Sequence, residues 1–106
     1  MRQARIVMPK TAKKGDVIEI KTLVTHPMET GYRRDDMGKP ISRDIISLLT
    51  VTYGGQEIFR MDMFPGVAAN PFAAFTTVAT ETGEFVFTWT DEHGDRHVEK
   101  ATLTVT

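Results

Sequence analysis

The chain has 106 residues, of which 41% are hydrophobic and 25% charged, and a net charge of −1, so we expect one soluble globular domain spanning residues 1–106. A domain of this size is too small to enclose a large active-site cleft, and the absence of cysteine excludes disulfides, thiolate catalysis and zinc ribbons. The sequence also lacks a bilayer-length apolar run, a signal-peptide pattern and a basic patch with aromatics, so we expect no membrane span, no leader and no nucleic-acid partner.

Alternation of apolar and polar residues predicts strands along most of the chain. Thr, Val and Ile total 31 residues against 4 Leu, and β-branched side chains favour pleated sheets over helices. The alternation is clearest at Val17–Thr25 and at Gly83–Thr90, where Phe85, Phe87 and Trp89 share one face. Seven strands are predicted, in this order: Arg5–Met8, Val17–Thr25, Ile45–Tyr53, Gln56–Phe64, Pro71–Thr80, Gly83–Thr90 and Arg96–Val105.

Residues that tolerate turn conformations separate these strands, and the Gly54-Gly55 pair predicts a two-residue hairpin turn. Seven short strands in a chain of this length are typical of an immunoglobulin-like antiparallel β-sandwich, so we expect an all-β fold of that class. The sequence predicts only the architecture. The cysteine pair of antibody domains is absent, and the single tryptophan, Trp89, lies on the sixth predicted strand.

The segment from His26 to Asp44 has no clear periodicity and carries four positive and four negative charges. It predicts a long loop, and loops of this length in a small domain are commonly either functional or mobile. We therefore consider a binding role for this loop.

Two regions have more apolar residues than a sheet with one solvated face needs. Ile46 and Leu48 lie on the opposite parity from Leu49 and Val51, and Phe72 and Phe75 lie near a turn. These residues either cap the ends of the core or contact a partner, because exposed apolar patches commonly mark interfaces. We take a partner interface as the working hypothesis for four of them: Ile46, Leu48, Phe72 and Phe75.

Residues that could carry chemistry do not form a catalytic set. His93 and His97 flank the predicted hairpin tip at Gly94-Asp95, which would splay their rings, so we expect no metal site. Neither Ser42 nor Ser47 lies in a nucleophile elbow, and no phosphate-binding glycine motif is present. His26, directly before a proline, is interpreted as structural. We expect a protein without enzymatic activity, metal or other cofactor.

Four strings, in this order and at this chain length, resemble the SoxZ family of the thiosulfate-oxidising Sox system. They are Lys13–Leu23, the His-Pro-Met-Glu-Thr-Gly string at 26–31, Ala69-Asn70-Pro71, and the Gly-Glu-Phe-Val-Phe-Thr-Trp-Thr-Asp string at 83–91. The resemblance implies the non-catalytic subunit of a sulfur-carrier heterodimer. In that family the SoxY partner carries the substrate on a cysteine, and a chain without cysteine fits the other role.

The resemblance also implies two binding tasks and a location. A stable heterodimer would use the apolar surplus, and the loop would dock the Sox enzymes transiently, since mixed charges tune association rates more than affinity. The docking candidates in the loop are His26, Met28, Arg33, Arg34 and Lys39. The family acts in the periplasm, so we expect export in complex with a signal-bearing partner. A free-standing immunoglobulin-like module that binds protein or carbohydrate is the alternative.

Overall fold

The computed structural model describes residues 3–106, in which eight strands and no helix are present. The strands are β1 (Ala4–Val7), β2 (Thr11–Ala12), β3 (Val17–Val24), β4 (Ile46–Tyr53), β5 (Gln56–Asp62), β6 (Phe72–Val78), β7 (Gly83–Asp91) and β8 (Arg96–Val105). All seven predicted strands are present, and β2 is additional. Within the described range, no helix could cross a membrane.

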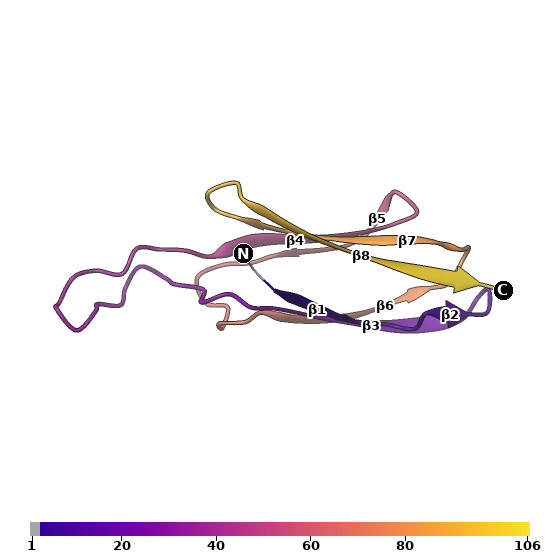
Figure 1. Cartoon of the computed structure of the whole chain (residues 1–106), viewed down its shortest axis with the longest axis horizontal. Helices are drawn as coiled ribbons and strands as arrows, with labels where there is room; N and C mark the ends of the chain where they lie inside the picture. Colours follow the sequence, from indigo (N-terminus) through magenta and orange to yellow (C-terminus); the bar gives the residue numbers. More distant parts are fainter. Residues whose placement is uncertain (1–2) are drawn as a thin grey trace.

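The strands form two sheets that pack as the layers of a sandwich (Figure 1). One sheet has three strands in the order β1-β3-β6, and the other has five in the order β2-β8-β7-β4-β5. Every pairing is antiparallel except that of β2 with β8, which joins Thr11 and Ala12 to the end of the chain. The predicted all-β, immunoglobulin-like architecture is confirmed.

The core forms where the alternating apolar faces of the two sheets meet, as in other β-sandwiches. From β3, every second residue from Ile18 to Val24 is buried, and from β7, Phe85, Phe87 and Trp89 are buried as predicted. The rings of Phe85 and Phe87 lie 6.4 Å apart, and those of Phe87 and Trp89 lie 6.3 Å apart. This row of rings supplies a large share of the buried apolar area.

A β-bulge changes the expected orientation of Ile46. The register between β4 and β7 shifts between Ile46 and Leu48, where the Ser47 hydroxyl donates a hydrogen bond to the Thr90 carbonyl, 3.1 Å away. An extra residue in one strand lets two consecutive side chains point to the same face, so Ile46 is only 2% exposed, in the core beside Ile45. The prediction that Ile46 lies on an accessible surface is therefore wrong.

The Gly54-Gly55 pair makes the predicted hairpin turn between β4 and β5. Both glycines have positive φ, 59° and 85°, which a two-residue turn of the favoured hand requires. Beside the turn, the Tyr53 hydroxyl donates to the Glu81 carbonyl and accepts hydrogen bonds from the backbone N–H groups of Thr80 and Glu81. Tyr53 thereby ties the β6–β7 connection to the end of β4.

Residues 26–44 form an arm that projects from one end of the sandwich (Figure 1). Two isolated bridges, Glu29 with Asp44 and Arg34 with Pro40, hold its two halves together. The arm contributes to the elongated shape of the molecule, which measures 58 × 20 × 20 Å. The predicted long loop is confirmed, and it projects away from the core.

Candidate interaction surfaces

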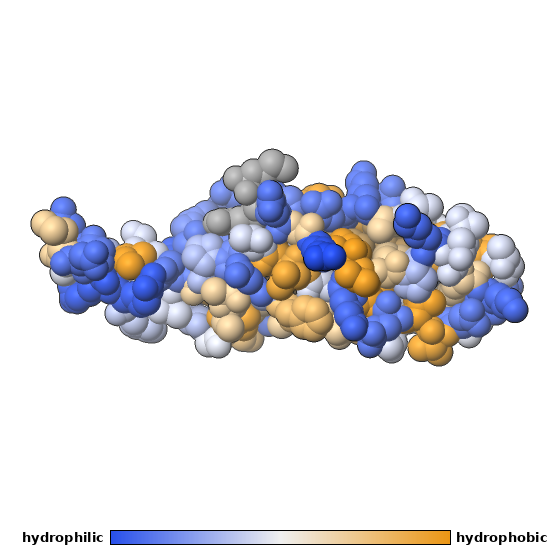
Figure 2. All heavy atoms as spheres, turned by 60° about the horizontal axis from the view of Figure 1, so that its bottom comes forward, coloured by the Kyte–Doolittle hydropathy of each residue, from blue (hydrophilic) through white to orange (hydrophobic). Residues whose placement is uncertain are grey.

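The outward side of the three-stranded sheet carries large apolar side chains, and we call it the apolar face. Figure 2 shows hydrophobic residues gathered over this sheet. The exposed fractions are 53% for Val7, 68% for Val17, 40% for Leu23, 58% for Phe72 and 45% for Val78. Leu23 pairs across the strands with Phe72, and Val17 pairs with Val78. Apolar side chains grouped on one surface in this way are typical of a protein contact.

The charged side chains on the apolar face are few and partly paired. Lys21 and Glu19 form an ion pair of 3.4 Å between its two apolar ends, and Arg5 lies beside Leu23 in the register of β1 with β3. A partner that covers the ion pair would bury both charges together, which avoids the cost of a buried charge without a counter-charge. The face thus has the composition of a contact surface, with apolar anchors and few charges.

The structure does not bring the four predicted interface residues together. Phe72 lies on the apolar face, whereas Phe75 points to the other side of β6, where its ring stacks on Phe59 with centroids 4.3 Å apart. Leu48 lies on the outer side of the five-stranded sheet, between Asp62 and Thr90, and Ile46 is in the core. Val7, Val17, Leu23 and Val78 were not predicted. For Val17 and Leu23 the sequence did contain a signal, because these two apolar residues stand at the two ends of the outward-facing side of β3, with Glu19 and Lys21 between them.

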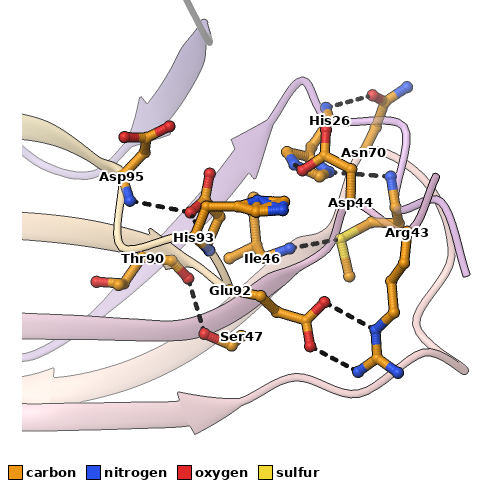
Figure 3. A network of polar contacts seen from close by, with 12 residues as sticks. His26, Arg43, Asp44, Ile46, Ser47, Asn70, Thr90, Glu92, His93 and Asp95 are labelled. Carbon is orange, nitrogen blue, oxygen red and sulfur yellow. Dashed lines mark hydrogen bonds and ion pairs between the residues drawn. The ribbon is translucent and has the colours of Figure 1, made fainter.

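The root of the arm is built around His26, which is 1% exposed. Its Nδ1 accepts the Met28 backbone N–H at 2.9 Å, which places the proton of the neutral ring on Nε2, 3.4 Å from Asp44 Oδ1. Asn70 holds the backbone of His26 from both sides: its Oδ1 accepts the His26 N–H at 2.9 Å, and its N–H donates to the His26 carbonyl at 2.7 Å (Figure 3). His26 therefore fixes the direction in which the arm leaves the sandwich.

Met28 completes this root. It has a positive φ of 51°, is 4% exposed, and its sulfur accepts the Ile46 backbone N–H at 3.3 Å. The hydrogen bond ties the arm to the bulge in β4. The prediction that His26 and Met28 form part of a docking surface is wrong, because both side chains are packed inside the molecule.

Two ion pairs, one within the arm and one to the neighbouring hairpin, involve three of its eight charged residues. The Arg33 guanidinium makes two hydrogen bonds to the Glu29 carboxylate, and this pairing lowers the pKa of Glu29 and raises that of Arg33. Arg43 makes two hydrogen bonds to Glu92, at 2.8 and 2.6 Å, which raise its pKa and connect the arm to the β7–β8 hairpin (Figure 3).

The tip of the arm is a turn closed by backbone and side-chain bonds. The Asp35 carboxylate accepts the N–H groups of Met37 and Lys39, both at 2.9 Å, and Arg34 donates to the Gly38 carbonyl at 2.9 Å. The Lys39 side chain is exposed, and so are those of Tyr32 and Met37, at 85% and 84%. Of the predicted docking residues, Arg33, Arg34 and Lys39 are therefore on the arm surface, with the first two bonded to the arm itself.

A hollow of about 370 Å³ lies near the root of the arm. Its lining residues are His26, Ile46, Trp89, Asp91, Asp95, Arg96 and His97. His97 bonds to Glu99 at 2.9 Å and lies against Trp89, with ring centroids 5.9 Å apart. Trp89 is only 2% exposed, so it does not form the solvent-lined aromatic platform that a carbohydrate-binding module would need.

Three potential metal ligands meet beside this hollow. Asp44, Asp91 and His93 each offer one ligand atom, and these atoms lie within 4.8 Å of one another. One oxygen of Asp91 already accepts the N–H groups of His93 and Asp95. Since acidic side chains at a surface often lie this close without a metal, the grouping alone does not identify a metal centre. The structure groups His93 with these two aspartates and places His97 against Trp89.

Comparison with known proteins gives one family and a set of related folds. The family model described as "Sulphur oxidation protein SoxZ" matches residues 5–102. No curated protein matches the chain. Among solved structures, a superoxide reductase (neelaredoxin) from Ignicoccus hospitalis is similar, with a TM-score of 0.70, 16% identity, and coverage of 97% of this chain and 80% of that chain. The sulfur carrier protein SoxY from Chlorobium limicola f thiosulfatophilum has a TM-score of 0.70 and 12% identity, over 97% of this chain and 79% of that chain. At these identities the two structures indicate a shared fold only.

Proposed function

The chain belongs to the SoxZ family and has a role in the Sox sulfur-oxidation system, and on that premise we propose that it is the non-catalytic subunit of a sulfur-carrier heterodimer. Its partner is a SoxY-like subunit that holds the sulfur substrate on a cysteine. A chain without cysteine has no thiol to carry that substrate, so its task is to bind and support the subunit that does.

The apolar face is the observation that carries this proposal. Five exposed apolar residues on one sheet are costly to leave in water, and covering them with a second protein would stabilise a dimer. The solved SoxY shares the sandwich fold, so a partner of that kind offers sheet faces of its own. Two sheets can pack face to face about 10 Å apart, as they do inside a sandwich.

We further propose that the arm docks the Sox enzymes that act on the carried substrate. Arg33, Arg34 and Lys39 lie on a projection at the end of the molecule, whereas the apolar face covers a side of the sandwich. An enzyme could therefore meet the arm while the partner subunit stays bound. The place of action is the periplasm, reached by export in complex with a signal-bearing partner.

Co-expression with a SoxY-like partner tests the proposal. The tagged chain is purified, and the intact masses of the complex and of its subunits are measured before and after incubation with thiosulfate and the conjugating enzyme. We expect a 1:1 heterodimer in which only the cysteine-bearing subunit gains mass. A chain that purifies alone, or that gains mass itself, would contradict the carrier role and favour a free-standing binding module.

A further inference from the structure

The exposed side of β3 carries a row of residues that is complementary to itself when reversed. Every second residue of the strand points outward, and these residues are Val17, Glu19, Lys21 and Leu23, all of them exposed. An apolar residue therefore stands at each end of the row, and one negative and one positive charge lie between them. Reversing the row places apolar on apolar and positive on negative.

Strand β6 has the same pattern beside β3, without the charges. Its outward, exposed residues are Phe72, Ala74, Thr76 and Val78, again with a large apolar side chain at each end. In the register of β3 with β6, the apolar ends of the two strands lie side by side, so both rows have their midpoint at the same level of the sheet. The two rows together are therefore complementary to a second copy of themselves.

A two-fold axis that runs across the strands through this midpoint brings two copies face to face. Each strand then lies antiparallel to its counterpart, Glu19 of each copy lies opposite Lys21 of the other, and apolar ends cover apolar ends. A two-fold interface needs this kind of self-complementarity, because the same patch is used on both subunits. An axis along the strands would instead place each charge opposite its own equivalent, which is unfavourable for like charges.

The other charges of the apolar face are compatible with the antiparallel arrangement. Lys21 and Glu19 are paired within the chain, yet their side chains are 49% and 59% exposed, so each can also meet the opposite charge of a second copy. Arg5 lies on the edge strand β1, at the level of Leu23. The axis would separate the two copies of Arg5 by six residues along the strands, or about 20 Å, so they would not repel at close range.

We propose that the chain, when its partner subunit is absent, forms a homodimer in which two apolar faces pack about this axis. Strands β1, β3 and β6 have four, eight and seven residues, and an interface of this small extent favours a dimer that dissociates readily. The inference does not require the proposed function. Because both assemblies use the apolar face, a SoxY-like subunit would have to displace the second copy before the heterodimer forms.

Sedimentation equilibrium of the full chain, expressed without a partner, tests the inference. We expect a reversible equilibrium between monomer and dimer. Glu19→Lys and Lys21→Glu each convert two attractive pairs across the axis into two repulsive ones, so we expect each variant to raise the dimer Kd about tenfold or more. An equimolar mixture of the two variants should restore dimerisation, because every pair across the axis is then attractive again.

The matched control is Glu84→Lys, which makes the same change of charge at an exposed residue of β7, on the outer side of the five-stranded sheet. We expect it to change the dimer Kd by less than about twofold. Restoration by mixing also controls for folding, because unfolded variants cannot complement each other.

The inference is overturned by any of four results. These are a chain that stays monomeric at every concentration, single variants that dimerise as well as wild type, a Glu84→Lys variant that is weakened equally, and a mixture that dimerises no better than its components. The proposed function is tested separately: a chain that does not assemble with a SoxY-like subunit would contradict the carrier role and leave the homodimer unaffected.

Discussion

Truncation of Phe72 to alanine provides the most direct test of the apolar face. A phenylalanine side chain can bury on the order of 200 Å², and Phe72 is 58% exposed in the free chain. A partner could thus remove about 115 Å² from water, worth about 3 kcal/mol at 25 cal/mol per Å². Alanine retains part of that contact, so we expect a loss of about 2 kcal/mol, or roughly 30-fold in Kd.

Titration calorimetry with purified SoxY-like partner measures this change, and Phe64→Ala is the matched control. Phe64 is 68% exposed but lies in the loop between β5 and β6, outside the apolar face. We expect its truncation to leave Kd unchanged. Because both rings are exposed, both variants should unfold within about 0.5 kcal/mol of wild type. Equal losses for the two variants, or none for Phe72→Ala, would refute the assignment of this face to the partner.

Two further predictions concern the structures that hold the sandwich and the arm. Tyr53→Phe removes a hydroxyl with three backbone partners, so we expect a loss of about 2 kcal/mol in the free energy of unfolding. Urea titrations measure this loss. The control is Tyr32→Phe on the exposed arm, which should change the free energy of unfolding by less than about 0.5 kcal/mol; equal losses for Tyr53→Phe and Tyr32→Phe would show that the hydrogen bonds of the Tyr53 hydroxyl do not account for the destabilisation. The hydrogen bonds to Arg33 lower the pKa of Glu29 in the folded chain, so the contribution of this pair is present above the ordinary glutamate range and is lost as the pH falls through the lowered pKa. The acid-induced shift of the arm's amide NMR signals that belongs to this pair should therefore fall below the pH range in which an ordinary glutamate titrates; a Glu29→Gln variant with the same acid transition would show that another group is responsible.

The strands of the core could be predicted because their signal is local. In β3 and β7 the side chains alternate between the core and the outside without interruption, so periodicity alone identifies both the strand and its buried face. β2 escaped prediction because Thr11 and Ala12 are too few for any periodicity. Their strand conformation depends on parallel pairing with Thr104 and Val105, far away in the sequence.

The errors at the surface have two different causes. The bulge at Ser47 turns Ile46 into the core, and nothing in the sequence marks where such an extra residue falls. The grouping of Phe72 with Phe75, in contrast, could have been avoided, because residues three apart on a strand point to opposite faces. The position of His26 at the root of the arm could not be predicted either, because its backbone is held by Asn70, which is distant in sequence.

The outer faces of the two sheets differ, and the difference argues for separate binding surfaces. On the five-stranded sheet, the central rows pair Thr50 with Thr88 and Thr52 with Val86, and threonine hydroxyls are solvated at little cost. Val98, 46% exposed beside Thr88, is its one strongly exposed large apolar residue among those described, against five on the other sheet. The three-stranded sheet presents Leu23 beside Phe72 instead. A subunit that covers this sheet would form a third layer along the side of the sandwich, while the arm projects from its end (Figure 1). Under the proposed function, stable assembly and transient docking then use separate surfaces and can proceed at the same time.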